Sequence, residues 1–183
     1  MTRAMSRFLR RFRKDEGGQL AIEFVIMVPL LFTVFLTSVE LGIYSMRQMW
    51  LDRGLDMTVR LVRLNTGQVP DHDDLKDMIC ERAGFIPDCA TSLKLEMRRV
   101  DPRNFVALSQ TADCSDKSQP VLPENAPTYI TGQEHDLMVL RACVTFDPLF
   151  PTTGLGFDFA QNADGAGQAQ MTAMSAFVQE PGN

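Results

Sequence analysis

An uninterrupted apolar run near the N-terminus constrains this chain more than any other feature. Residues 20–39 read LAIEFVIMVPLLFTVFLTSV, and Glu23 is the only charged residue among them. At about 1.5 Å per residue, a helix over this run would rise about 30 Å, roughly the thickness of the hydrocarbon core of a bilayer. A core helix of a soluble protein is usually shorter and has a polar face. The run therefore predicts a transmembrane helix over residues 19–45.

The charged residues are segregated along the chain. Residues 1–14 hold six of the 18 basic residues, namely Arg3, Arg7, Arg10, Arg11, Arg13 and Lys14. A basic cluster beside a membrane segment favours a cytoplasmic location for that side. We therefore expect a basic cytoplasmic leader over residues 1–18, a single span in the inner membrane, and a periplasmic domain over residues 46–183.

The charge balance beyond the leader bears on the partners of that domain. Without residues 1–18 the chain has 12 basic and 21 acidic residues, a net charge of −9. A domain that binds nucleic acid needs Lys and Arg to neutralise phosphates. We therefore expect membrane lipid, and no nucleic acid, among the partners of this chain.

The residues that flank the apolar run indicate where the chain could be processed. After the run, Glu40, Leu41 and Gly42 offer no small-x-small site for a signal peptidase. Before it, the segment EGGQLAIEF over residues 16–24 resembles a type IV prepilin processing site, with a basic leader, a Gly before the cut and a Glu five residues into the mature chain. The resemblance places the cut between Gly18 and Gln19, so that Glu23 is residue +5 and Phe24 is residue +6.

More narrowly, the chain resembles the TadE-like minor pilins, or pseudopilins, of the tight-adherence (Flp) pilus system. The matching words are EGGQLAIEFVIMVPLLFTVFLTSVELG at 16–42, the Cys-containing stretch at 78–95 and, more weakly, TAMSAFVQEP at 172–181. The resemblance implies processing by a prepilin peptidase and a role in assembling an adhesive pilus, together with other pilin subunits and the assembly platform. Major Flp pilins are far shorter, which favours the minor class.

Glu23 and Pro29 are the unusual residues of the predicted span. A carboxylate in a membrane costs about 3 kcal/mol or more, so it is usually functional. The resemblance implies that Glu23 pairs with the new amine on Gln19 and sets the register of neighbouring subunits; the alternative is that Glu23 merely extends to the headgroups. Pro29 should kink or loosen the helix, since it lacks the amide hydrogen. This kink either aids extraction from the bilayer or is ordinary tolerance of proline in membrane helices.

The helix is predicted to continue beyond the membrane to about residue 65. Apolar residues recur there at helical spacing, and Gly67 and Pro70 end the pattern. The recurring residues are Tyr44, Leu51, Leu55, Val59 and Val62. We therefore expect a helical extension over residues 46–66 that packs under the soluble domain.

The rest of the domain is predicted to be a small antiparallel sheet with loops over residues 92–179, preceded by a short helix at 71–84. Alternating apolar residues predict strands at 92–100, 136–146 and 171–178, and a weaker strand at 104–110. Proline, glycine and polar residues predict loops or turns at 111–135, 148–159 and 162–170. The fold class is therefore α+β, with a long N-terminal helix packed on a small antiparallel sheet.

Four cysteines lie in the part of the chain expected in the oxidising periplasm, where disulfides form. Four cysteines allow three pairings, and we favour Cys80 with Cys89 and Cys114 with Cys143. The spacing contains no CxxC and the two histidines, His72 and His135, are isolated, so a structural zinc site is disfavoured.

No motif of an enzyme stands out in the sequence. We find no Gly-rich phosphate loop, GxSxG or HExxH, and the acidic cluster around His72 is more typical of a helix start than of a cation site. We therefore expect no enzymatic activity, no cofactor and no metal. The alternative to a minor pilin is a single-span envelope protein that retains residues 1–18 and whose periplasmic domain tethers a partner.

Overall fold

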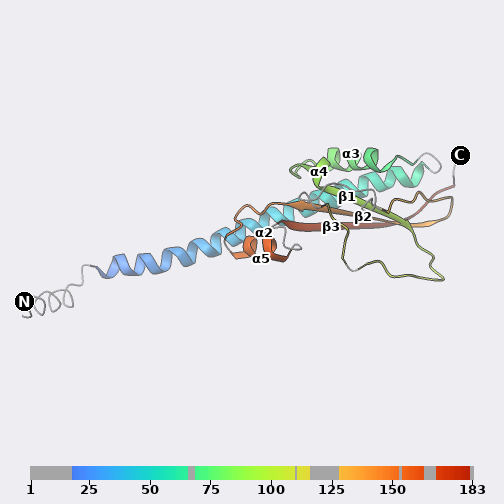
Figure 1. Ribbon diagram of the computed structural model, residues 1–183. Coiled ribbons are helices and arrows are strands. Elements are labelled where there is room, and N and C mark those ends of the chain that lie inside the picture. The colour runs from blue at the N-terminus through green and yellow to red at the C-terminus, as the bar shows by residue number, and fades with distance from the viewer. Residues whose placement is uncertain are drawn as a thin grey trace, which may run out of the picture.

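The computed structural model describes residues 18–65, 69–109, 111–115, 128–152, 154–162 and 168–181. One long helix, α2 (Gln19–Leu64), carries a small α+β domain on its C-terminal half, while its N-terminal half projects away from that domain (Figure 1). This is the predicted fold class. The predicted basic leader lies outside the described residues, except for Gly18.

Helix α2 runs without interruption through Pro29. Its C-terminal half buries one face at helical spacing, and Leu51, Leu55 and Val62 are each at most 1% exposed. Helix α3 (His72–Ala83) packs against this half. The two helices approach closely at Gly54, where a Cβ would lie 3.0 Å from the Ala83 Cβ and 3.0 Å from the Ile79 carbonyl oxygen.

The predicted short helix begins and ends as its sequence indicated. The Asp71 carboxylate caps α3 by accepting a 2.8 Å hydrogen bond from the Asp74 amide. Gly84 ends the helix at a φ of 41°, a conformation that favours glycine. A short helical turn, α4 (Cys89–Ser92), then leads into the sheet.

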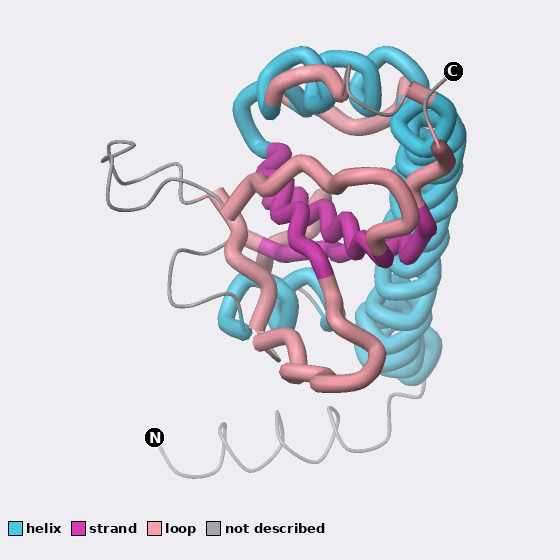
Figure 2. Tube along the Cα trace, turned by 90° about the vertical axis from the view of Figure 1, so that its right-hand side faces the viewer, coloured by secondary structure: helices cyan, strands magenta, loops and turns pink. Residues whose placement is uncertain are grey.

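The sheet has three antiparallel strands in the order β1 (Leu93–Arg99), β2 (Leu137–Phe146) and β3 (Ala169–Val178). In the register, Leu95 lies opposite Ala142, and Ala142 lies opposite Ala173. These residues belong to the core, together with apolar residues of α2 and α3. Figure 2 shows α2 along one side of the sheet, with α3 and α5 at opposite ends of the view.

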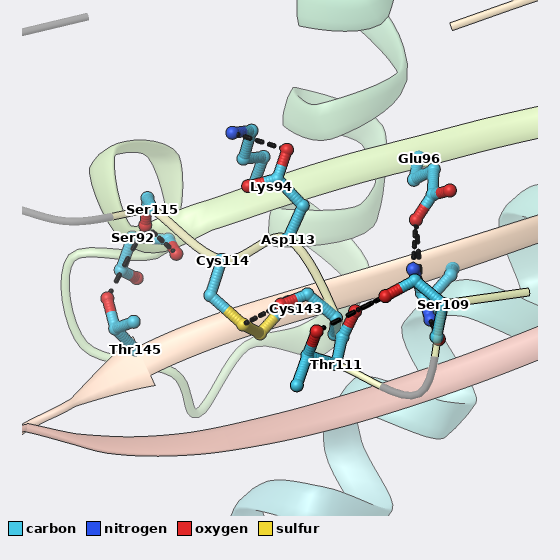
Figure 3. The surroundings of a disulfide bond; sticks show 12 residues. Ser92, Lys94, Glu96, Ser109, Thr111, Asp113, Cys114, Ser115, Cys143 and Thr145 are labelled. Carbon is cyan, nitrogen blue, oxygen red and sulfur yellow. Dashed lines mark hydrogen bonds and ion pairs between the residues drawn. A yellow bond between two sulfur atoms is a disulfide. The ribbon is translucent and has the colours of Figure 1, made fainter. Parts of the chain in front are cut away.

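On the opposite face of the sheet, the segment that follows β1 lies over β1 and β2, whereas Thr172 and Met174 of β3 remain exposed. Cys114 of this segment forms a disulfide with Cys143 of β2, and Ser115 donates a hydrogen bond to the Ser92 carbonyl (Figure 3). The Arg141 guanidinium, buried on this face, donates to the Glu96 carboxylate and to the Ser109 carbonyl. The segment is thus held to the sheet by one covalent bond and several polar contacts.

Two predicted elements are wrong. Residues 104–109 form no strand, and Phe105 and Val106 are 64% and 72% exposed. The outer edge of β1 is occupied by residues 128–130, which bond to both backbone groups of Met97. The segment at 104–110 therefore has no β1 edge to pair with; Gln110 lies outside the described residues.

The second error is the loop predicted at 148–159, which contains the start of helix α5 (Gly154–Asn162). The glycines that suggested a loop instead permit close packing. Gly154 has a φ of 49°, and a Cβ on Gly156 would lie 2.3 Å from the Phe150 carbonyl oxygen. Most of the small-residue turn predicted at 162–170 lies outside the described residues, and β3 begins two residues earlier than predicted.

Tyr129 is the main side chain of the segment on the β1 edge. Its hydroxyl donates a 2.7 Å hydrogen bond to the Pro70 carbonyl, and its ring makes an edge contact with His72. Burial of this side chain, with the nearby Asp71 and Asp74 carboxylates, raises the pKa of Tyr129 to about 12. The segment after α2 is thereby joined to the sheet.

Candidate functional site

The residues of the candidate processing site lie at the beginning of α2. Gly18 precedes the helix, and its carbonyl accepts a 3.2 Å hydrogen bond from the Ile22 amide. Its φ is −92°, and a Cβ at this position would meet nothing within 4 Å. The described fold therefore does not require glycine at residue 18, in contrast to Gly54 of the same helix.

Glu23 and Phe24 follow on the exposed surface of the first turns of α2. The Phe24 side chain is 66% exposed, and its apolar neighbours Ile22 and Val25 are equally open. Among the described residues, no hydrogen bond or ion pair is formed by the Glu23 carboxylate. A carboxylate surrounded by apolar side chains, without a counter-charge, is an expensive arrangement in lipid.

The apolar part of α2 has the properties of a membrane span. Its most apolar 18-residue window has a mean hydropathy of 2.4, and none of that window is buried in the protein. By length and composition this helix could cross a membrane. A helix with this surface needs a partner other than the domain, and lipid is the partner that its composition fits.

The hydroxyl groups within this part of α2 are satisfied inside the helix itself. Thr33 donates to the Pro29 carbonyl at 2.8 Å, and Ser38 donates to the Val34 carbonyl at 2.8 Å. Thr37 donates to the carbonyls of Thr33 and Val34. Such bonds to the preceding turn remove polar groups from contact with hydrocarbon.

Glu40 marks the place where α2 enters the domain, and the sequence did not single out this residue as functional. Its side chain is 2% exposed, although it comes directly after the apolar run. The two carboxylate oxygens accept hydrogen bonds from the Leu149 and Phe150 amides, each at 3.0 Å. The only signal in the sequence was a second carboxylate at the end of an apolar run, and its partners lie more than one hundred positions away.

The four cysteines form the two pairs that the sequence favoured. Cys80 and Cys89 join α3 to α4, and Cys114 and Cys143 join the covering segment to β2. Both bonds lie in the domain and stabilise it rather than the exposed part of α2. Among the described residues, no group of three or more His, Cys, Asp or Glu side chains is placed to hold a metal ion.

The comparison with known families concerns the long helix. A family model described as TadE-like protein matches residues 18–60. The match spans 43 of the 183 residues and lies almost entirely on α2. This match confirms the predicted resemblance for the first of its three stretches, and it covers both the Gly18–Glu23 spacing and the apolar run. The stretches at 78–95 and 172–181 lie outside the match. No curated protein and no solved structure matches the chain.

The TadE-like match has three general consequences. The TadE-like family is a structural, non-enzymatic one, and the match over residues 18–60 suggests involvement in the Tad pilus system. It also suggests contact with components of that pilus in general. The long apolar helix at the N-terminus agrees with a membrane-anchored, pilin-like protein.

Proposed function

We propose that this protein is a minor pilin, or pseudopilin, that takes part in assembling the Tad pilus. In this proposal α2 crosses the inner membrane with residues 1–18 in the cytoplasm and the α+β domain in the periplasm. A prepilin peptidase cleaves between Gly18 and Gln19, and the mature chain then associates with other pilin subunits or with the assembly platform. The protein has no enzymatic activity of its own.

The observation that carries this proposal is the placing of Gly18 and Glu23 within the TadE-like match. Gly18 is exposed at the very start of α2, where the fold imposes no need for glycine. A peptidase that binds an extended backbone in a narrow groove would explain the residue, because glycine has no side chain to exclude. Glycine at residue 18 would then be required for recognition by the peptidase and not for folding of the chain.

Glu23 has a proposed role that depends on that cleavage. Cutting after Gly18 creates an ammonium group on Gln19, one helical turn from the Glu23 carboxylate. An ion pair with this amine, in the same chain or a neighbouring one, offsets part of the cost of a charge in lipid. Where the pair joins two chains, it forms only at one vertical offset and so fixes the register of adjacent subunits.

The proposal is tested in cells that lack this chain and are supplied with single variants. We expect Glu23→Gln to be processed and inserted normally but to abolish or greatly reduce pilus assembly, measured by sheared filaments. The matched control is Glu81→Gln, which neutralises an exposed carboxylate on α3 and should leave assembly unchanged. Normal pili from the Glu23→Gln strain would contradict the register role.

Processing is tested with two glycines at the surface of the same helix region. We expect Gly18→Leu to block cleavage, because the new side chain occupies the peptidase groove. Gly42→Leu is the control, since a Cβ there also meets nothing within 4 Å. Equal cleavage of both variants would contradict the proposed site, and a chain that functions with its leader retained would favour the tethering protein.

A further inference from the structure

The segment between β2 and β3 is fastened to α2 at the end of its apolar run. The Leu149 and Phe150 amides bond to Glu40, and Gly154 packs so closely on Thr37 that a Cβ at residue 154 would lie 2.0 Å from the Thr37 Cγ2. Helix α5 also contacts α2. Figure 1 shows α5 as the part of the domain nearest to the projecting half of α2.

This segment exposes large apolar side chains beside the end of the apolar run of α2. Leu149 is 51% exposed and Phe157 is 48% exposed, while the adjacent residues Pro148 and Gly156 are buried. Over residues 148–162 the sequence has one charged residue, Asp158. On α2 itself, the neighbouring Phe35 is 62% exposed. The apolar surface of the span therefore continues onto the domain instead of ending at Glu40.

We propose that residues 148–152 and α5 form an interface element that rests in the outer headgroup layer of the membrane, with Leu149 and Phe157 directed into the lipid. The inference goes beyond pilus assembly but rests on the proposed span, because α2 must cross the bilayer to bring residues 37–40 to its outer surface. The occupant of this surface is lipid.

Position along α2 decides between lipid and a protein partner. The apolar run ends at Val39, and both attachment points, Thr37 and Glu40, lie within one helical turn of that end. A protein that covered Leu149 and Phe157 would have to displace headgroups to reach them. Aromatic and aliphatic side chains on an element with little charge are favoured in the headgroup layer.

A second contact with the bilayer has a mechanical consequence for the anchor. A single helix can slide and tilt within a membrane, since a mismatch between its apolar length and the bilayer thickness costs little free energy per Å. The interface element prevents α2 from sinking further inward, because Glu40 and α5 move with it. The height of the domain above the membrane is then fixed by the protein itself.

The experiment measures the depth of single tryptophans in vesicles. The chain has one tryptophan, Trp50, and all variants of the full chain carry Trp50→Phe. Phe157→Trp and, independently, Leu149→Trp report on the interface element. The vesicles contain phosphatidylethanolamine and phosphatidylglycerol, with bromine on the acyl chains either near the glycerol or near the chain end.

Two further variants serve as controls on depth. Phe32→Trp places the probe in the middle of the apolar run, at a side chain that is 59% exposed. Val178→Trp matches Phe157 in exposure, at 49%, but Val178 adjoins Gln179, which bonds to the Val62 carbonyl. Val62 lies about 33 Å further along α2 than Glu40, at the rise of an α-helix.

We expect both interface probes to lose emission to lipids brominated near the glycerol, Phe32→Trp to lose it to lipids brominated near the chain end, and Val178→Trp to lose none. Unquenched interface probes beside a quenched Phe32→Trp overturn this inference but leave the span intact. Blue-shifted, unquenched interface probes also overturn it, because a second protein copy would then cover them. An unquenched Phe32→Trp overturns both the inference and the proposed membrane anchor.

Discussion

The two halves of helix α2 have the same backbone and opposite surroundings. In the N-terminal half, Phe24 and Phe35 are 66% and 62% exposed, whereas Leu51 and Leu55 in the C-terminal half are at most 1% exposed. The packed half finds its apolar partners in α3 and the sheet. Among the described residues, none of the most apolar 18-residue window of the exposed half is buried in the domain, and this surface fits lipid or neighbouring helices. One continuous helix can therefore serve two environments. Its side chains change from exposed to packed at a defined residue, which here is Glu40.

The largest expected effect is the difference in stability loss between a leucine truncated in the packed half and one truncated in the exposed half. Leu55→Ala should lower the free energy of unfolding of the domain by about 2–5 kcal/mol, because it leaves a cavity in a close-packed core. Leu31→Ala removes the same atoms from a side chain that is 60% exposed, and it should leave the domain unaffected. Urea unfolding of the full chain in detergent micelles, followed by Trp50 emission, measures both. Equal losses would mean that the N-terminal half also packs on the domain.

The disulfides sharpen the comparison, because both lie on the packed side. Replacing Cys114 and Cys143 with serine should cost about 3–4 kcal/mol, and replacing Cys80 and Cys89 about 2–3 kcal/mol, since the longer loop restricts the unfolded chain more. The sequence separations are 29 and 9 residues. The same unfolding measurement ranks the two pairs, and the reverse order would contradict the loop-entropy argument.

The boundary between the two halves of α2 is tested with two carboxylates, Glu40 at the end of the apolar run and Glu23 near its beginning. Glu40→Ala leaves the Leu149 and Phe150 amides without their acceptor, at a cost of about 2 kcal/mol. Hydrogen exchange of these two amides should speed up strongly. Glu23→Ala removes a carboxylate that has no partner among the described residues, and it should leave exchange at both amides unchanged. Unaltered exchange in Glu40→Ala would show that the segment is held by other contacts.

The smallest expected effect is a pH dependence of stability that arises at Tyr129, which bonds to Pro70 beyond the C-terminal end of α2. Tyr129 has a pKa of about 12 because of burial and the nearby Asp71 and Asp74 carboxylates. The folded state therefore keeps its proton after the unfolded state has lost it, so stability falls as the pH rises from about 10 to 12. Tyr129→Phe should cost about 1 kcal/mol at neutral pH, through the lost bond to Pro70, and should weaken this alkaline decline.

The control for this pH dependence is the absorbance of tyrosinate during an alkaline titration of the folded chain. The chain has two tyrosines, so the phase near pH 12 should be absent from Tyr129→Phe and present in Tyr44→Phe. A phase that persists in Tyr129→Phe would contradict the assignment.

Much of this structure follows from local patterns in the sequence. The apolar run, the helical spacing after Tyr44 and the alternation at 92–100 and 136–146 each depend on neighbours within a few residues. They predicted α2, the sheet and its antiparallel class. The cysteine pairing was also favoured correctly, because the chain offers few alternatives.

The boundary could not be predicted in the same way, because it depends on contacts between distant residues. Gly154 and Gly156 suggested a loop, but they permit the close approach of α5 to Thr37 and to the Phe150 carbonyl. The partners of Glu40 lie 109 and 110 positions along the chain. The segment at 104–110 failed as a strand since residues 128–130 occupy the β1 edge, a competition that no local pattern records.

The central claim, that this chain is a processed pilin-like subunit, is tested most directly by the mass of its N-terminus. The protein is extracted from membranes of cells with and without their prepilin peptidase and analysed by mass spectrometry. Our account predicts a mature chain that begins at Gln19 only when the peptidase is present. A chain that begins at Met1 or Thr2 in both strains would contradict the account.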